Sequence, residues 1–181
     1  MRLKFKKLGN LRDQEEKRKT IQEVIKSLAI LSDDFSLGIT GNVSLKTKEG
    51  ILISATSTEL KSINYPGDFC EVVSSSTDKR LNFYGSKLPS SETRMHLLVY
   101  EKRPDISFCL HIHLSNLERL QIFDKFPITS KFLSYGTINL VEEASNLLES
   151  GNIVILRDHG IVIVGNSFEE MIKEVRRLNK I

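Results

Sequence analysis

Two histidines, His111 and His113, stand two residues apart in the stretch SFCLHIHLS, in a chain with only four histidines. If this stretch is a strand, alternate residues face the same side, so both imidazoles share one face. The other face is apolar and consists of Phe108, Leu110, Ile112 and Leu114. Two adjacent imidazoles repel each other when both are protonated and bury polar groups when both are neutral. A divalent metal removes both problems because each neutral ring offers it a lone pair. The pair therefore favours a metal site over a polar strand face with satisfied histidines.

A metal needs further ligands, and four other residues are candidates for a place near the pair. His159 precedes a glycine in RDHG, where a tight turn can project its side chain, although it can also be a simple turn residue. Glu92 begins a predicted helix that leads into the histidine strand, where a carboxylate also suits the helix dipole. His96 lies between residues that look buried, so we expect a structural role. Cys109 shares the histidine face, and we expect a small buried thiol.

Three segments rich in hydroxyl groups predict an anion site. They are SLGITGNVS, SATS and PSSE, the last at the start of a predicted helix. Glycine turns and helix N-termini expose N–H groups that bind phosphate. Each segment is common by itself, but together with a metal site they predict an anionic ligand. The polar residues that these segments offer include Thr40, Asn42, Ser44, Thr56, Ser57, Ser90 and Ser91.

The elements that must position these residues follow from hydrophobic periodicity. Helices are predicted near 13–31, within 88–104, near 140–150 and 167–180, and more weakly at 116–122. Ser90 or Ser91 is the expected cap of the second helix. Strands are predicted near 43–47, 51–54, 70–75 and 107–115, and on both sides of a turn at 157–160. This alternation predicts an α/β fold in which helices flank a mixed sheet, built as one domain over residues 1–181.

Composition excludes several other classes of protein. The chain is 40% hydrophobic and 27% charged, as in soluble globular domains, with a net charge of only +3. We expect no nucleic-acid partner, because the eight Lys and Arg among the first 20 residues are most simply a solvated helix face. We expect no membrane partner, since no stretch is long and apolar enough. Two scattered cysteines and the lack of a signal-peptide pattern favour a cytoplasmic location.

Four segments, in order, resemble the class II aldolase/adducin family: TGNVSLK, ILISATS, LPSSETRMHLLVYEKRPDISFCLHIHLS and RDHGIVIVGNSFEEM. The resemblance spans about Ile21 to Val175 and includes all four histidines. It implies a three-layer α/β/α fold with a mostly antiparallel central sheet. It also implies a homotetramer with active sites between subunits.

By motif position, the resemblance implies that His111, His113 and His159 hold one Zn²⁺ per subunit and that Glu92 is the catalytic acid/base. It implies that the phosphate of a small substrate is held by Asn42, Thr56, Ser57, Ser90 and Ser91. The implied activity is that of a zinc-dependent class II aldolase-like lyase, acting on a phosphorylated sugar or ketose through a metal-stabilised enediolate. A dehydratase such as the methylthioribulose-phosphate enzyme and an epimerase such as the ribulose-phosphate 4-epimerase stay open, as does a non-catalytic adducin-like module.

Departures from the family pattern concern the substrate end of the site. Ala55 replaces a usual proline, Ser57 replaces a usual glycine, and Asp158 stands where asparagine or histidine is frequent. The connection between the second and third metal histidines is shorter than in the sugar-phosphate aldolases. Tyr135 is the candidate for a proton-donating tyrosine.

A cupin is the remaining alternative, because His111, His113 and Glu118 imitate its ligand spacing. The glycines that bracket that motif are absent, and a strong predicted helix leads directly into the histidine strand. A cupin is a β jelly roll, so this alternative is disfavoured.

Overall fold

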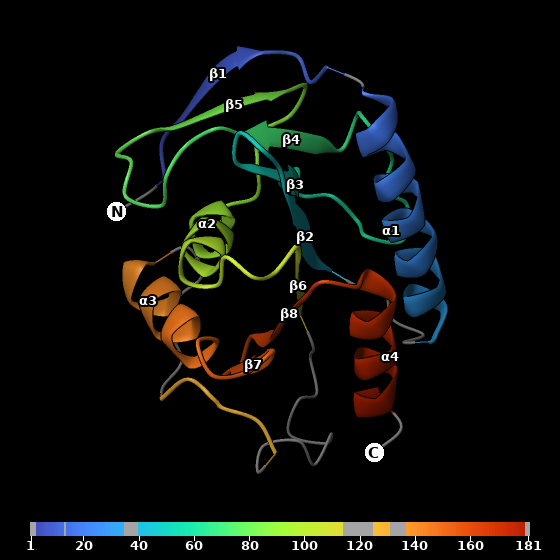
Figure 1. Cartoon of the computed structure of the whole chain (residues 1–181), viewed down its shortest axis with the longest axis vertical. Helices are drawn as coiled ribbons and strands as arrows, with labels where there is room; N and C mark the ends of the chain where they lie inside the picture. The colour runs from blue at the N-terminus through green and yellow to red at the C-terminus, as the bar shows by residue number, and fades with distance from the viewer. Residues whose placement is uncertain (1–2, 13, 35–39, 114–124, 131–136, 180–181) are drawn as a thin grey trace.

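A mixed eight-stranded sheet forms the centre of the molecule, with helices on both faces (Figure 1). The structure, a computed structural model, describes residues 3–12, 14–34, 40–113, 125–130 and 137–179, with the side chains of 32–34, 178 and 179 left out. In spatial order the strands are β1 (Phe5–Gly9), β5 (Leu81–Gly85), β4 (Phe69–Val72), β3 (Ile51–Ser54), β2 (Gly41–Lys46), β6 (Phe108–His113), β8 (Gly160–Gly165) and β7 (Ile153–Leu156). Only β1 and β5 pair in parallel; the other neighbours are antiparallel.

The helices form two layers, one on each face of the sheet. On the right of Figure 1 lie α1 (Glu15–Asp34) and α4 (Phe168–Asn179), and on the left α2 (Thr93–Lys102) and α3 (Ile138–Leu147). Each pair buries an apolar stripe against the sheet, which produces two hydrophobic cores. The core under α1 and α4 takes Leu110 and Ile112 of β6. The predicted α/β fold, with three layers and a mostly antiparallel sheet, is confirmed.

Most predicted elements are present, with shifts of a few residues at their ends. Two strands were missed. β1 alternates poorly, because Lys6, Lys7 and Leu8 are all exposed, and it exists only through its pairing with β5. β5 does alternate, with Leu81 and Phe83 buried, but it is only five residues long. The helix predicted at 116–122 lies outside the described residues.

The predicted cap of α2 is wrong in detail. Glu92 is the N-cap, and no side chain makes the cap hydrogen bond. The Ser90 hydroxyl instead accepts a hydrogen bond from the Glu92 amide, one step before the helix. The three residues before α2 therefore form a turn that places Glu92 at the start of the helix. Neither serine caps the first helical turn with its side chain.

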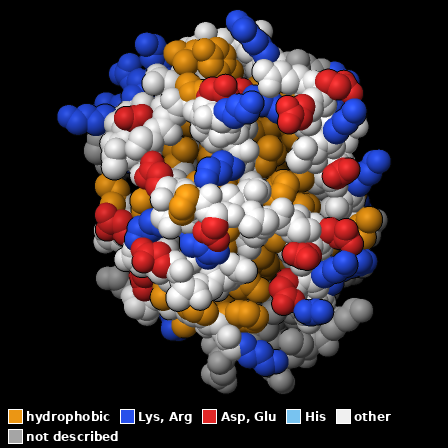
Figure 2. Space-filling view, in the orientation of Figure 1, with side chains coloured by type: hydrophobic (Ala, Val, Ile, Leu, Met, Phe, Trp, Pro, Cys, Tyr) orange, Lys and Arg blue, Asp and Glu red, His pale blue; other side chains and the backbone are white. Residues whose placement is uncertain are grey.

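Surface charge is mixed, and Figure 2 shows Lys, Arg, Asp and Glu side chains interspersed over the face in view. Within the described residues, no helix combines the length and the apolar character that crossing a bilayer requires.

Two glycines allow β2 and β8 to close on β6 from opposite sides. Gly41 of β2 is paired with Ile112, and Gly160 of β8 is paired with His113. A Cβ atom at Gly41 would lie 2.1 Å from the His111 carbonyl oxygen, and one at Gly160 would lie 2.1 Å from the Ile112 carbonyl oxygen. The end of β6 that carries the histidines is thus clamped by backbone on both sides.

We predict that Gly160→Ala lowers the free energy of unfolding by about 1–3 kcal/mol, because the added methyl group must push β8 away from β6. Urea unfolding measures this change. Gly151→Ala is the matched control: a Cβ there meets nothing within 4 Å, so we expect a change within about 0.5 kcal/mol. Equal destabilisation by the two substitutions would contradict the steric argument.

Candidate metal centre

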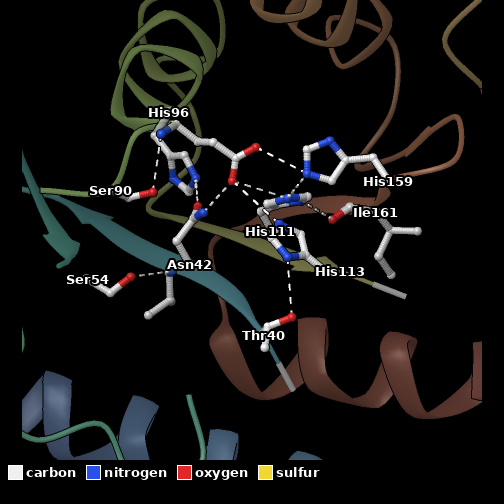
Figure 3. A network of polar contacts seen from close by, with 11 residues as sticks. Thr40, Asn42, Ser54, Ser90, His96, His111, His113, His159 and Ile161 are labelled. Atoms are coloured by element: carbon white, nitrogen blue, oxygen red, sulfur yellow. Dashed lines mark hydrogen bonds and ion pairs between the residues drawn. The ribbon is translucent and has the colours of Figure 1, made fainter. Parts of the chain in front are cut away.

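Four side chains from three separate segments converge at one end of the sheet. Glu92 precedes α2, His111 and His113 lie on β6, and His159 lies in the turn between β7 and β8. One potential ligand atom of each lies within 4.8 Å of those of the others. Figure 3 shows the three labelled imidazoles of this group turned toward one another. No other such group of three or more His, Cys, Asp or Glu side chains occurs among the described residues.

The alternation of β6 selects which side chains enter the site. Leu110 and Ile112 enter the core under α1 and α4, whereas Cys109 enters the core under α2 and α3, on the same face as the two histidines. His111 is fully buried, while the side chain of His113, at the end of the strand, is 43% exposed. One ring is therefore anchored inside the protein and the other faces the opening of the site.

A left-handed residue sets the position of His159. Asp158 has a φ of 56°, a conformation that aspartate tolerates better than most residues. The His159 amide then donates to the Leu156 carbonyl at 3.0 Å and closes the turn. The structure thus explains why a short polar residue precedes the histidine.

Hydrogen bonds to the far ring nitrogens decide which nitrogens face the centre. His111 Nδ1 is 2.9 Å from the Ile161 carbonyl oxygen, which can only accept, so this nitrogen carries the proton and Nε2 keeps its lone pair. His113 Nδ1 is 3.3 Å from the Thr40 hydroxyl, which leaves its Nε2 directed at Glu92 Oε2, 3.8 Å away. The His111 ring therefore presents the tautomer that a metal ion requires, and His113 directs its Nε2 toward the same centre.

The contacts at the centre fit a cation. His111 Nε2, with its lone pair, lies 3.3 Å from His159 Nε2 and 3.3 Å from Glu92 Oε2. A lone pair facing a carboxylate oxygen at this distance is repulsive unless positive charge lies between them. The second oxygen, Glu92 Oε1, is buried and accepts no hydrogen bond within the described part of the chain, although His159 Nε2 is 3.5 Å away. The imidazole and carboxylate donors are those that hold divalent metals such as Zn²⁺.

Burial and neighbouring charge determine the protonation states. Burial lowers the pKa of His111 and lowers that of His159 to about 4, so both rings are neutral near pH 7. For Glu92, burial raises the pKa, but the surrounding histidines and a hydrogen bond from Asn42 lower it further, below its ordinary value. The bond from Asn42 persists whether the rings are charged or neutral. The site therefore places the neutral imidazoles of His111 and His159 beside a carboxylate whose ionised form is favoured by the hydrogen bond from Asn42.

A pocket of about 380 Å³ adjoins the metal centre and shares Glu92 and His113 with it. Its lining includes all five residues predicted for the anion: Asn42, Thr56, Ser57, Ser90 and Ser91. None of its described lining residues is Lys or Arg. Ser57, with a φ of 57°, adopts the left-handed conformation for which the family's usual glycine is suited. An anion bound here would be held by hydroxyl and backbone N–H groups.

Other sequence candidates have different places. Cys109 is fully buried, and burial raises the pKa of its thiol. His96 is also fully buried and lies outside the ligand group, as expected for a structural residue. Tyr135 and Glu118 lie outside the described residues.

Sequence reasoning missed the groups that orient the ligands. Thr40 and the Ile161 carbonyl hold two of the histidine rings, and Asn42 donates to Glu92 Oε2 at 2.6 Å. A backbone carbonyl carries no signal in a sequence, because every residue has one. These contacts depend on strand register, which the pattern of residue types does not reveal.

Known proteins resemble this chain in both sequence and fold. A family described as the Class II Aldolase and Adducin N-terminal domain matches residues 21–181. The L-fuculose phosphate aldolase of Methanococcus vannielii is 30% identical over 182 residues, covering 89% of this chain and 96% of that protein. The 3-oxo-tetronate 4-phosphate decarboxylase of Haemophilus influenzae is 25% identical over 152 residues, covering 73% of this chain and 70% of that protein. A solved L-fuculose 1-phosphate aldolase matches with a TM-score of 0.70 at 26% identity, covering 88% of this chain and 82% of that one.

Burial of a neutral histidine predicts a pH dependence of stability. Burial lowers the pKa of His96 to about 3, below the value of about 6.5 in an unfolded chain. Between these values the unfolded state binds about one more proton, so stability falls as the pH decreases, by about 1.4 kcal/mol per pH unit for this proton. Urea unfolding of the metal-free protein between about pH 6.5 and pH 5 measures the slope, in a range where most carboxylates stay ionised.

His96→Gln is the matched variant, because it removes the titrating group and keeps a polar side chain. We expect a shallower decline of stability with decreasing pH in this variant. Identical slopes in the two proteins would contradict the burial of a neutral imidazole at position 96.

Proposed function

Because the chain belongs to the class II aldolase and adducin N-terminal domain family, we propose that it is a zinc-dependent lyase that cleaves a phosphorylated sugar or ketose. The observation that carries the proposal is that Glu92 belongs both to the candidate metal site and to the adjoining pocket. This carboxylate lies within the group of three imidazoles and also lines the hydroxyl-rich pocket. A ligand in that pocket is within reach of a base and of a metal site at once.

The family resemblance inferred from the sequence motifs is confirmed by these matches. The expectation of an enzyme of the metal-dependent lyase type is also confirmed at the level of the family, since the relatives include aldolases and a decarboxylase. An adducin-like module without catalysis is disfavoured, because a scaffold has no need for a carboxylate beside three oriented imidazoles.

Each residue has a proposed task. His111, His113 and His159 would hold the divalent ion, which supplies a Lewis acid to stabilise negative charge on a substrate oxygen. Glu92 would accept and return the substrate proton, because it is ionised and borders the pocket. The hydroxyls of Thr56, Ser57, Ser90 and Ser91, together with Asn42, would hold the phosphate and position the reacting carbon.

The reaction type is proposed as aldol cleavage, with elimination of water or epimerisation as the alternatives. In all three reactions, negative charge develops on a substrate oxygen that the metal ion would stabilise. The set of metal ligands therefore does not choose between them. The named relatives include an aldolase and a decarboxylase of phosphorylated substrates, which supports a phosphorylated ketose and leaves its identity open. The homotetramer implied by the resemblance and the cytoplasmic location inferred from the cysteines and the N-terminal sequence stay predictions, the first testable by sedimentation.

We predict that His111→Ala abolishes metal binding, because it removes the buried and best-oriented ligand. Elemental analysis of protein purified without chelator should fall from about one zinc per subunit to nearly none. Cys109→Ala, two residues away on the same strand face, is the control and should keep its zinc. Wild-type protein that neither contains zinc nor binds added zinc would contradict the metal site.

We predict that Glu92→Gln keeps zinc but lowers turnover by about 10²- to 10⁴-fold, because the proton acceptor is lost. Product analysis with L-fuculose 1-phosphate and other ketose phosphates identifies the substrate and measures the rate. Full activity of Glu92→Gln on the true substrate would show that another group is the base.

A further inference from the structure

A line of buried polar side chains leads away from the metal centre, starting at Glu92. Asn42 Nδ2 lies 2.6 Å from Glu92 Oε2, and Asn42 Oδ1 lies 2.5 Å from His96 Nε2. His96 Nδ1 lies 2.7 Å from the Ser44 hydroxyl, which is 3.0 Å from the Tyr100 hydroxyl. Figure 3 shows Asn42 and His96 adjacent to each other beside the imidazole group. All five side chains are buried.

Regular spacing in two elements builds this line. Glu92, His96 and Tyr100 recur every four residues, so they lie along one face of α2 and its cap. Asn42 and Ser44 are two residues apart on β2, so they face the same side of the sheet. The line therefore consists of one helix face set against one strand face, and rigid secondary structure fixes its geometry.

The atoms in contact set the direction of the hydrogen bonds between Glu92 and Ser44. Asn42 turns its NH₂ group, which can only donate, to Glu92 and its carbonyl oxygen, which can only accept, to His96. His96 Nε2 must then donate, and since this ring is neutral, its Nδ1 accepts from the Ser44 hydroxyl. Tyr100 donates to the Ser44 backbone oxygen at 3.0 Å, and its hydroxyl also lies 3.0 Å from the Ser44 hydroxyl. The three donors from Ser44 to Asn42 therefore point toward the carboxylate.

The line makes the two oxygens of Glu92 different. Oε2 is held by Asn42, whereas Oε1 accepts no hydrogen bond from any residue that the structure describes. Without the hydrogen bond from His96, the amide of Asn42 would be held only at its Nδ2, by Glu92, and its oxygen would lose its partner. The orientation of Glu92 thus depends on a histidine that does not touch the metal centre.

We propose that His96, acting through Asn42, is a positioning residue for the proton-transferring carboxylate of Glu92. Its Nε2–H tautomer holds Asn42 as a donor to Oε2 and leaves Oε1 available for the substrate proton. The role of Glu92 in proton transfer rests on the proposed function. The direction of the hydrogen bonds among Glu92, Asn42 and His96 does not depend on that function. It also assigns the amide of Asn42 first to Glu92, ahead of any contact with a phosphate.

The first test needs no substrate. Nitrogen-15 NMR of the full-length, zinc-loaded protein reports the tautomer of each histidine, and Zn²⁺ is diamagnetic. We expect His96 to be neutral with its proton on Nε2. We also expect the NMR signal of the Asn42 side-chain amide to shift in His96→Asn and to return toward its wild-type position in His96→Gln. A proton on Nδ1 of His96, or an Asn42 amide signal indifferent to both substitutions, would overturn the proposal.

The second test separates positioning from simple structural support. Glutamine places its amide near the position of Nε2 and can still donate to Asn42, whereas asparagine reaches only the position of Nδ1. We expect His96→Asn to lower kcat by about 10- to 100-fold with little change in KM, and His96→Gln to recover at least about tenfold of that loss. Both variants should keep their zinc, since neither removes a ligand.

Val99→Ala is the control for destabilisation, because Val99 is fully buried on the same helix and lies outside the line. It should lower the melting temperature and leave kcat unchanged at temperatures where the protein is folded. Equal loss of kcat in His96→Asn and His96→Gln would refute the positioning role. If no ketose phosphate is turned over at all, the proposed function fails, and the NMR measurement still decides the hydrogen-bond line.

Discussion

The pairing of β6 with β2 on one side and β8 on the other is the constraint on which the site depends. This register brings Asn42 beside His111 and sets the end of β8, with the adjoining turn, beside His113. Gly41 and Gly160 allow the flanking backbones to approach within a distance that excludes a side chain. A slip of one residue would turn the histidines into the opposite core and remove the Ile161 carbonyl from His111.

Within that frame, the candidate site places three imidazole rings around one buried carboxylate. A carboxylate that is only 4% exposed requires compensation, and the site supplies it from two directions. A cation held by the imidazoles would face one side, and the donor line that ends at Asn42 supports the other. The same contacts that make the charge tolerable also orient the carboxylate, so the stability and the geometry of the site rely on them together.

Much of the fold was predictable, because buried residues recur about every 3.6 residues in a helix and every second residue in a strand. The stripe of α4 and the alternation of β6 are strong patterns, and both elements were predicted within two residues of their ends. β1 was not predicted, because it is an exposed edge strand whose lysines lie on both of its faces. It therefore lacks the alternation of buried and exposed residues that identifies a strand. The start of α2 was misplaced because Ser90 supports the turn before the helix rather than its first turn.

For the site, the sequence by itself indicated the kinds of candidate ligand and, through the family resemblance, the residues expected to provide them. The spacing of His111 and His113 placed both on one strand face, since alternation is a local property of the backbone. Only the tertiary structure decided that His159, 46 or more residues farther along the chain, meets them, and that His96 belongs to a donor line ending at Glu92. Such contacts depend on which strands pair and in which register, and that is a property of the whole sheet rather than of any segment.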